Sequence, residues 1–186
     1  MGRPKIVIVP LMEGFEEIEA VTIIDVLRRA DLDVRVAGDQ VGAVRGAHGI
    51  SVVVDCELAD VDPATVSMVV LPGGMPGASH LRENPDVQAL LQVVDGADGY
   101  VAAICAAPIA LAAAGVITGK RVTCYPGYES ELEGAHFVED RVAIDEHLVT
   151  SRGPGTAMEF ALELVALLED EKRADVLREQ MLVHTA

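Results

Sequence analysis

The stretch YVAAICAAPIAL, residues 100–111, decides the fold of this chain. Its first five residues form an apolar run typical of a buried strand, and the alanine-rich run from Ala106 is typical of a helix, so the pattern predicts a strand–turn–helix unit with Cys105 at the turn. Such a turn pushes one side chain out above a parallel sheet, as in a nucleophile elbow. A thiol there faces the positive end of the helix dipole, which favours the thiolate. The alternative is a buried structural cysteine, because cysteine is among the most buried residue types.

Strand and helix patterns alternate on both sides of this unit. Apolar runs predict strands at 5–10, 33–37, 67–71, 100–104, 121–125, 136–138, 141–144 and 147–150, with a hairpin or irregular strands within 41–54. Apolar residues at helical spacing predict helices at 16–30, 85–95, 157–168 and 170–181, and a helix after Cys105 that Gly115 closes. This alternation predicts an α/β fold with a doubly wound, mostly parallel sheet, whose ligands bind beyond the carboxyl ends of the strands.

The composition predicts one globular domain over residues 1–186, because the chain is long enough for a sizeable core and shows no shift in composition. Its 14 basic and 30 acidic residues give a formal net charge of −16. A chain this acidic repels phosphate backbones, so we exclude nucleic acid as a direct partner.

The sequence also carries expectations about location. Residues 1–5 lead only into a short apolar strand, so we expect no signal peptide. The longest apolar stretch, 100–117, contains Pro108 and Gly115 and begins with strand character, so we interpret it as a buried strand and helix rather than a membrane span. Three cysteines are too few for a disulfide framework in a chain of this size. We therefore expect a cytoplasmic protein with no membrane partner.

Three segments meet at the predicted carboxyl edge of the sheet: the loop after the first strand, the loop 72–77, and the turn at Cys105. The second of these contains Gly73 and Gly74 between prolines, and such a loop lets backbone N–H groups approach a ligand closely. The sequence therefore predicts a site at this edge, with Cys105 at its centre.

The loop after the first strand contributes acidic residues, namely Glu13, Glu16, Glu17 and Glu19. Acidic side chains favour a helix N-terminus, and this is the interpretation we prefer for Glu16 and Glu17. Glu19 lies between apolar neighbours and is the candidate to face inward, where a carboxyl group can tune the thiol or accept its proton.

Five segments stand out in order along nearly the whole chain: GFEEIE (14–19), DVLRRA (25–30), LPGG (71–74), AAICA (102–106) and SRGPGT (151–156). Together they resemble the ThiJ/PfpI superfamily, in the branch of the Parkinson-disease-associated protein deglycase. The tail after Leu168 resembles the extra C-terminal helix of that branch. The resemblance implies a flavodoxin-like sandwich with that extra helix, and a homodimer.

The resemblance also implies roles for individual residues. Cys105 falls on the reactive cysteine of the family, and Glu19 falls on an acid whose protonated form contacts the thiol. Gly74 and Ala106 fall where the family offers backbone N–H groups to an oxyanion, and the same groups suit a cysteine sulfinate formed by peroxide. Gly73 is expected beside them in the pocket.

Tyr125 is a departure from many relatives, which place a histidine at this pocket position, immediately before a proline. A tyrosine, whose ordinary pKa is about 10, is a poor general base at neutral pH. A cysteine peptidase or amidase is therefore the function that we expect least.

The other cysteines and the histidines have plainer interpretations. We expect Cys124 to be a buried strand cysteine, with a resolving thiol as the alternative, and Cys56 to be inert. No metal site is expected, because no ligand spacing links the five histidines, His48, His80, His136, His147 and His184.

The resemblance implies a cysteine-dependent stress protein that acts on small 2-oxoaldehydes or on their early glycation adducts, as a glutathione-independent glyoxalase or deglycase. Thiol addition and proton transfer suffice for this chemistry, so no cofactor is expected. The alternative is a redox-sensing, chaperone-like protein that responds through oxidation of Cys105 without turning over a substrate.

Overall fold

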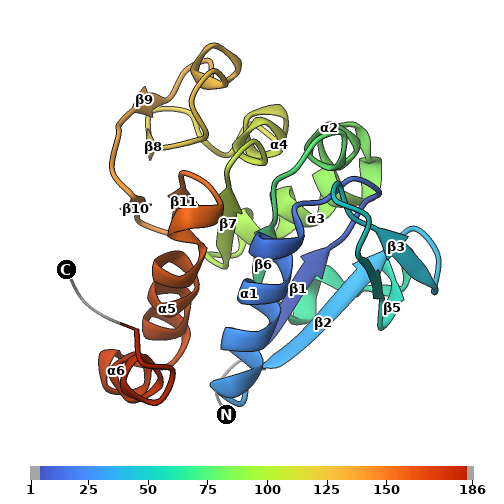
Figure 1. The fold of residues 1–186 in the computed structure, drawn as a ribbon. Helices are drawn as coiled ribbons and strands as arrows, with labels where there is room; N and C mark the ends of the chain where they lie inside the picture. The colour runs from blue at the N-terminus through green and yellow to red at the C-terminus, as the bar shows by residue number, and fades with distance from the viewer. Residues whose placement is uncertain (1–4, 184–186) are drawn as a thin grey trace.

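A computed structural model of the chain describes residues 5–183 (Figure 1). Residues 1–4, on which the expectation of no signal peptide partly rests, and His184 lie outside this range. The strands are β1 (Ile6–Pro10), β2 (Asp33–Gly38), β3 (Ala43–Arg45), β4 (Ser51–Val53), β5 (Cys56–Glu57), β6 (Val66–Leu71), β7 (Tyr100–Ile104), β8 (Arg121–Val122), β9 (His136–Phe137), β10 (Val142–Asp145) and β11 (Leu148–Ser151). The α-helices are α1 (Glu17–Arg29), α2 (Gly77–Glu83), α3 (Pro85–Gly96), α4 (Pro108–Ala113), α5 (Ala157–Leu168) and α6 (Glu171–Gln180).

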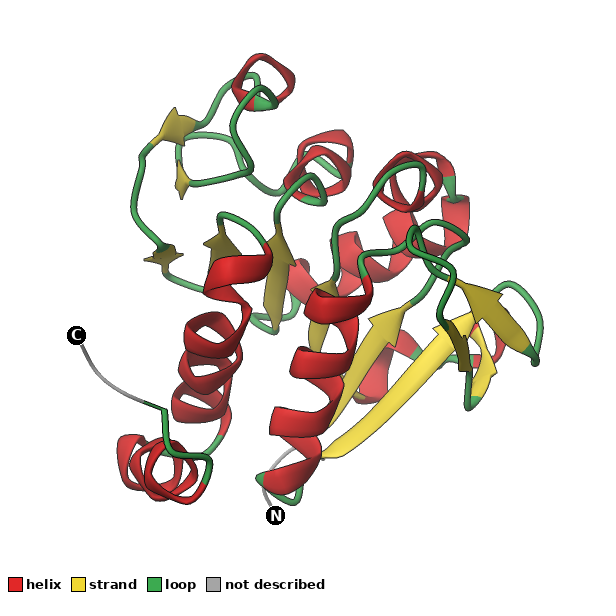
Figure 2. Cartoon of the chain, viewed as in Figure 1, coloured by secondary structure: helices red, strands yellow, loops and turns green. Residues whose placement is uncertain are grey.

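A seven-stranded sheet in the order β10-β11-β7-β6-β1-β2-β5 forms the centre of the fold (Figure 2). Its strands pair in parallel, except that β10 and β11 are antiparallel. All five residues of β1 are buried, as expected of a strand covered on both faces. The predicted α/β fold with a mostly parallel sheet is therefore confirmed.

Helices cover both faces of this sheet: α1, α5 and α6 lie on one side, and α2, α3 and α4 lie on the other (Figure 1). Alternate side chains of β1 point to opposite faces of the sheet and pack into two separate apolar cores. Val7 and Val9 face the core of α1 and α5, while Ile8 faces the core of α3 and α4. The apolar face of α6 packs on α5 through Ala174 and Leu177, which confirms the extra C-terminal helix.

Three parts of the chain differ from the sequence-based expectation: the strand predicted at 121–125, helix α2 and strand β5. The strand predicted at 121–125 ends at Val122, because the next residue turns away and Thr123 N–H donates to the Thr150 hydroxyl at 2.9 Å. This short strand pairs with β9 outside the central sheet. Of the two alternatives predicted for 41–54, the structure has the hairpin, the antiparallel pair β3–β4. The sequence analysis did not identify α2 or the two-residue edge strand β5.

The long apolar stretch 100–117 forms β7 and α4, as predicted. None of the helices within residues 5–183 combines the length and the apolar character needed to span a bilayer.

Candidate active site

Cys105 lies at a sharp turn between β7 and α4. It is a non-glycine residue in the left-handed region, with φ of +66°. The backbone is held on both sides, since Cys105 N–H donates to Ser151 C=O at 2.9 Å and Cys105 C=O accepts from Tyr125 N–H at 2.8 Å. The predicted strand–turn–helix elbow is therefore present, and only 9% of Cys105 is exposed. Such a recessed thiol is accessible only to a small molecule.

The positive φ of Cys105 predicts a measurable strain. A side chain with a Cβ costs about 1 kcal/mol in this region, whereas glycine adopts it freely. We therefore expect Cys105→Gly to have a free energy of unfolding about 1 kcal/mol higher than Cys105→Ala, although both lack the thiol. Urea denaturation of the two variants measures this difference. Equal stabilities, or a more stable alanine variant, would contradict the argument.

The loop after β6 lies against the turn and against the start of α1. A Cβ added to Gly73 would lie 2.7 Å from Cβ of Cys105 and 2.8 Å from Oε2 of Glu19, so only glycine fits between these two side chains. Gly73 C=O accepts from the backbone N–H of Glu16 at 2.8 Å, which ties the loop to α1. At Gly74, φ is +90° and an added Cβ would collide with the backbone nitrogen of Glu16. Close packing of backbones, which glycines permit, thus brings the two loops together.

Glu19 is completely buried and reaches this point from the first turn of α1. Its Oε2 accepts a hydrogen bond from Gly73 N–H at 2.8 Å, and the carboxyl group interacts with the Cys105 thiol. Its other oxygen, Oε1, is buried with no nitrogen or oxygen partner among the described residues. The inward orientation predicted for Glu19 is thus the one found.

Burial controls the protonation of this pair. It raises the pKa of Glu19 from its ordinary 4.5 to about 7, against the opposing effect of the Gly73 hydrogen bond. Burial and the neighbouring Glu19 carboxylate raise the pKa of Cys105 to about 12, although the N–H groups of Ala106 and Gly74 at the sulfur act to lower it. Around pH 7 the pair therefore passes from two protons to one, and the two groups titrate together.

Burial and the neighbouring Glu19 carboxylate oppose the thiolate that the helix dipole is expected to favour at Cys105. Helix α4 begins at Pro108 and has six residues. The backbone N–H groups of Ala106 and Gly74 act in the opposite direction and favour the thiolate, but the pKa of the thiol is still raised to about 12. A thiolate therefore depends on transfer of its proton to Glu19.

The raised pKa of Glu19 also predicts how stability changes with pH. Because the pKa is higher in the folded state, wild-type protein loses stability as pH rises from about 4.5 to about 7, by about 3 kcal/mol. Glu19→Gln has no such ionisation, and its amide retains an oxygen for Gly73 N–H. The difference in unfolding free energy between Glu19→Gln and wild type should therefore grow in favour of the variant by about 3 kcal/mol over this range. Urea denaturation at several pH values measures it, and a difference independent of pH would refute the assignment.

Tyr125 lies beside the turn through its backbone contact with Cys105, and its half-exposed ring packs against Gly153. Cys124 is buried in the apolar core that includes α3 and α4, in the segment after β8 and not within a strand. Cys56 is half-buried in β5, and burial raises its pKa.

Two adjoining clefts, of about 370 and 490 Å³, lie beside Met12, Glu13 and Asp39 and do not include Cys105 among their lining residues. These clefts are wide and acidic. The nucleophile, the buried carboxyl group and the two backbone N–H groups lie instead at the recessed Cys105 thiol. We therefore place the candidate active site at Cys105. The sequence analysis did not predict the contact of His48 with Glu16 and Glu17. His48 and Glu17 are 31 residues apart, and no pattern in the sequence links them.

These features define the class of protein: an α/β fold with a cysteine at a nucleophile elbow, a buried carboxyl group beside its thiol, and two backbone N–H groups at its sulfur. Comparison with known proteins agrees with this class. The model of the DJ-1/PfpI family matches residues 5–167. The chain belongs to the DJ-1/PfpI family.

Relatives in this family match over most of the chain. It is 40% identical to "Protein dj-1beta" of Drosophila melanogaster, over 96% of this chain and 97% of that protein, and 40% identical to "Glutathione-independent glyoxalase DJR-1.2" of Caenorhabditis elegans, over 89% of each. The crystal structure of Drosophila melanogaster DJ-1beta has a TM-score of 0.94 at 39% identity, covering 97% of this chain and 99% of that one. The fold and the family expected from the sequence are thus confirmed.

The lengths of the relatives differ. "Protein DJ-1 homolog B" of Arabidopsis thaliana is 44% identical over 92% of this chain, but the match covers 40% of that protein. For "Protein DJ-1 homolog A" the covered share is 45%. The chain therefore spans less than half the length of these two plant relatives.

Proposed function

We propose that this protein is a cysteine-dependent, glutathione-independent glyoxalase that converts small 2-oxoaldehydes such as methylglyoxal to 2-hydroxy acids. The observation that carries the proposal is the contact of the buried Glu19 carboxyl group with the Cys105 thiol, next to the N–H groups of Gly74 and Ala106. The relative named as a glutathione-independent glyoxalase supports it. Early glycation adducts of the same aldehydes are the related substrate class.

The reaction begins when the Cys105 thiol passes its proton to Glu19 and the sulfur adds to the aldehyde carbon. This step forms the carbon–sulfur bond of a hemithioacetal, whose oxygen the N–H groups of Gly74 and Ala106 stabilise. Glu19 returns the thiol proton to this oxygen and becomes a carboxylate again. The carboxylate then takes the proton from the former aldehyde carbon and delivers it to the neighbouring carbon, while the hydroxyl proton passes to the neighbouring oxygen, which leaves a thioester of the hydroxy acid. Water hydrolyses the thioester, releases the acid and restores the thiol. The net change is addition of one water, so no cofactor is required.

The recessed position of Cys105 supports a small substrate, because only 9% of the residue is exposed. The test of the proposal is formation of lactate from methylglyoxal without glutathione, and its loss in Cys105→Ala. The homodimer and the cytoplasmic location expected above stay predictions.

The second candidate is a redox-responsive protein in which peroxide converts Cys105 to a sulfinate. Its support is the same pair of N–H groups, which can donate to sulfinate oxygens. A peptidase is disfavoured, because Tyr125, whose ring packs on Gly153, provides no imidazole as a general base.

A further inference from the structure

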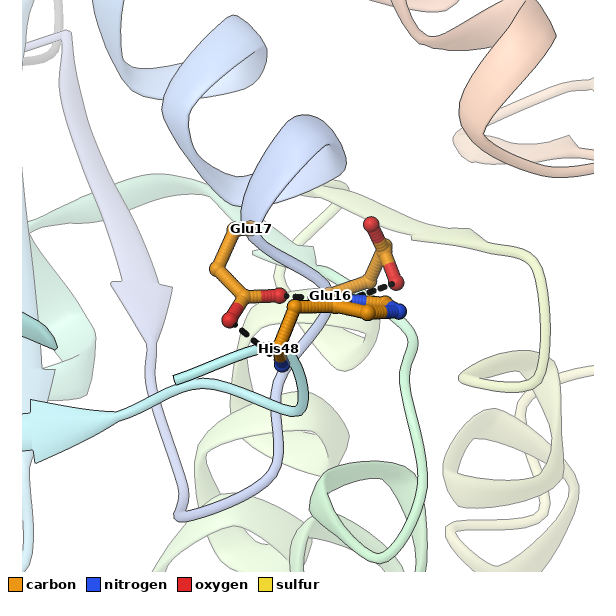
Figure 3. Close-up of side chains that lie close together, drawn as sticks. All are labelled: Glu16, Glu17 and His48. Atoms are coloured by element: carbon orange, nitrogen blue, oxygen red, sulfur yellow. Dashed lines mark hydrogen bonds and ion pairs between the residues drawn. The ribbon is translucent and has the colours of Figure 1, made fainter. Parts of the chain in front are cut away.

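Three side chains with metal-binding atoms meet at the start of α1, outside the Cys105 site: Glu16, Glu17 and His48 (Figure 3). Nδ1 of His48 lies 2.9 Å from Oε2 of Glu17 and 3.4 Å from Oε2 of Glu16. The three ligand atoms all lie within 4.8 Å of one another. The cluster joins α1 to the loop of the β3–β4 hairpin, so it exists only in the folded chain.

The backbone holds two of these side chains in place. Oε1 of Glu17 accepts the backbone N–H groups of His48, at 2.6 Å, and of Ile50, at 3.3 Å, which leaves Oε2 directed at the imidazole. The hairpin loop is itself fixed to the segment before α1, since Ala47 N–H donates to Phe15 C=O at 2.9 Å. Supporting hydrogen bonds of this kind orient ligands before an ion arrives.

Glu16 is mostly buried and has few partners. Its side chain is 11% exposed, and it caps α1 without a hydrogen bond from its side chain. Within residues 5–183 its carboxylate has a single ion pair, the 3.4 Å contact with His48, and no hydrogen bond. A buried carboxylate is costly unless it is paired or coordinates a metal. One imidazole therefore faces two carboxylates.

We propose that Glu16, Glu17 and His48 form a binding site for a divalent transition-metal ion of the zinc type. Ligand atoms of a tetrahedral zinc ion lie about 3.3 Å apart, given the usual zinc–nitrogen and zinc–oxygen distances. The contacts of 2.9 and 3.4 Å from the imidazole lie on either side of this spacing, and the two carboxylate ligand atoms lie within 4.8 Å of each other. An ion can therefore replace the proton between the imidazole and the carboxylates when the two carboxylates adjust their positions. His48 is exposed, which leaves a coordination position open to water.

The test is calorimetric titration of the metal-free protein with Zn²⁺ alone, without any substrate. We expect one ion to bind per chain, and His48→Gln and Glu16→Gln each to weaken binding about tenfold or more. His136→Gln is the matched control, because it removes another exposed histidine far along the chain, and Cys105→Ala excludes binding by the thiol. Both controls should retain the affinity of the wild type.

Other results would overturn the proposal: no saturable binding, equal loss in His136→Gln, or a loss confined to Cys105→Ala. Circular dichroism checks that each variant folds. The visible absorption of bound Co²⁺ gives a second measurement, since it should change in His48→Gln even where some affinity remains. These measurements do not involve turnover, so their outcome is independent of the proposed glyoxalase activity.

Discussion

Cys105→Ala is expected to form no lactate from methylglyoxal above the uncatalysed background in the absence of glutathione, while the wild type forms it steadily. The sulfur makes the covalent bond of the proposed reaction, and no other group at the turn can replace it. Loss of a nucleophile costs about a thousandfold in rate or more. An enzymatic lactate assay measures the difference, and circular dichroism shows whether the fold is retained.

Cys124→Ala is the matched control for this experiment. It removes another buried thiol, to which the proposed mechanism gives no part, so it should retain activity. If Cys105→Ala keeps the activity of the wild type, the proposed mechanism is wrong. If folded wild-type protein forms no lactate, the glyoxalase proposal fails, and sulfinate formation at Cys105 under dilute peroxide, followed by mass spectrometry, tests the second candidate.

Glu19→Gln is expected to lower the turnover of methylglyoxal by about 10²- to 10⁴-fold, the usual contribution of a positioned acid–base group. It should also change the reactivity of the thiol. In the wild type, alkylation of Cys105 by iodoacetamide should accelerate as pH rises through about 7, because the pair then loses one proton and the remaining one is shared. An amide cannot accept the thiol proton. In Glu19→Gln the thiol must therefore release its proton to solvent against desolvation, and the transition near pH 7 should disappear.

Rates of alkylation across pH, followed by mass spectrometry in a buffer containing a chelator, measure this effect. The negative charge of Glu16 also raises the pKa of Glu19. The chelator removes any cation that would neutralise this charge. Cys105→Ala identifies alkylation at the other cysteines. A transition near pH 7 that persists in Glu19→Gln would show that the proton resides elsewhere.

Local sequence was sufficient to predict the elbow and the strands around it. The apolar run 100–104, the cysteine and the alanine-rich continuation define a strand, a turn and a helix within a few residues, where nearest-neighbour preferences dominate. Glu19 was predictable for a similar reason, since it lies between the apolar residues Ile18 and Ala20. The five motifs then pointed to the family.

The protonation of the pair could not be predicted from the sequence. The sequence pattern indicated a helix dipole behind Cys105. The desolvation of Cys105 and Glu19, and their close approach beside Gly73, depend on how segments distant in the sequence pack together. His48 shows the same limit, because its contact with Glu17 spans 31 residues of chain and depends on the hairpin. The early end of β8 also depends on a distant partner, the Thr150 hydroxyl.

Three glutamates at the N-cap and in the first turn of α1 contact different groups: Glu19 contacts the thiol, while Glu17 and the N-cap residue Glu16 contact His48. An α-helix turns about 100° and rises 1.5 Å for each residue. Adding or removing one residue between Glu17 and Glu19 would therefore turn Glu19 by about 100° relative to Glu17, so that both could not keep their partners. Most surface loops tolerate insertions, but the spacing of these glutamates within the helix is part of the site.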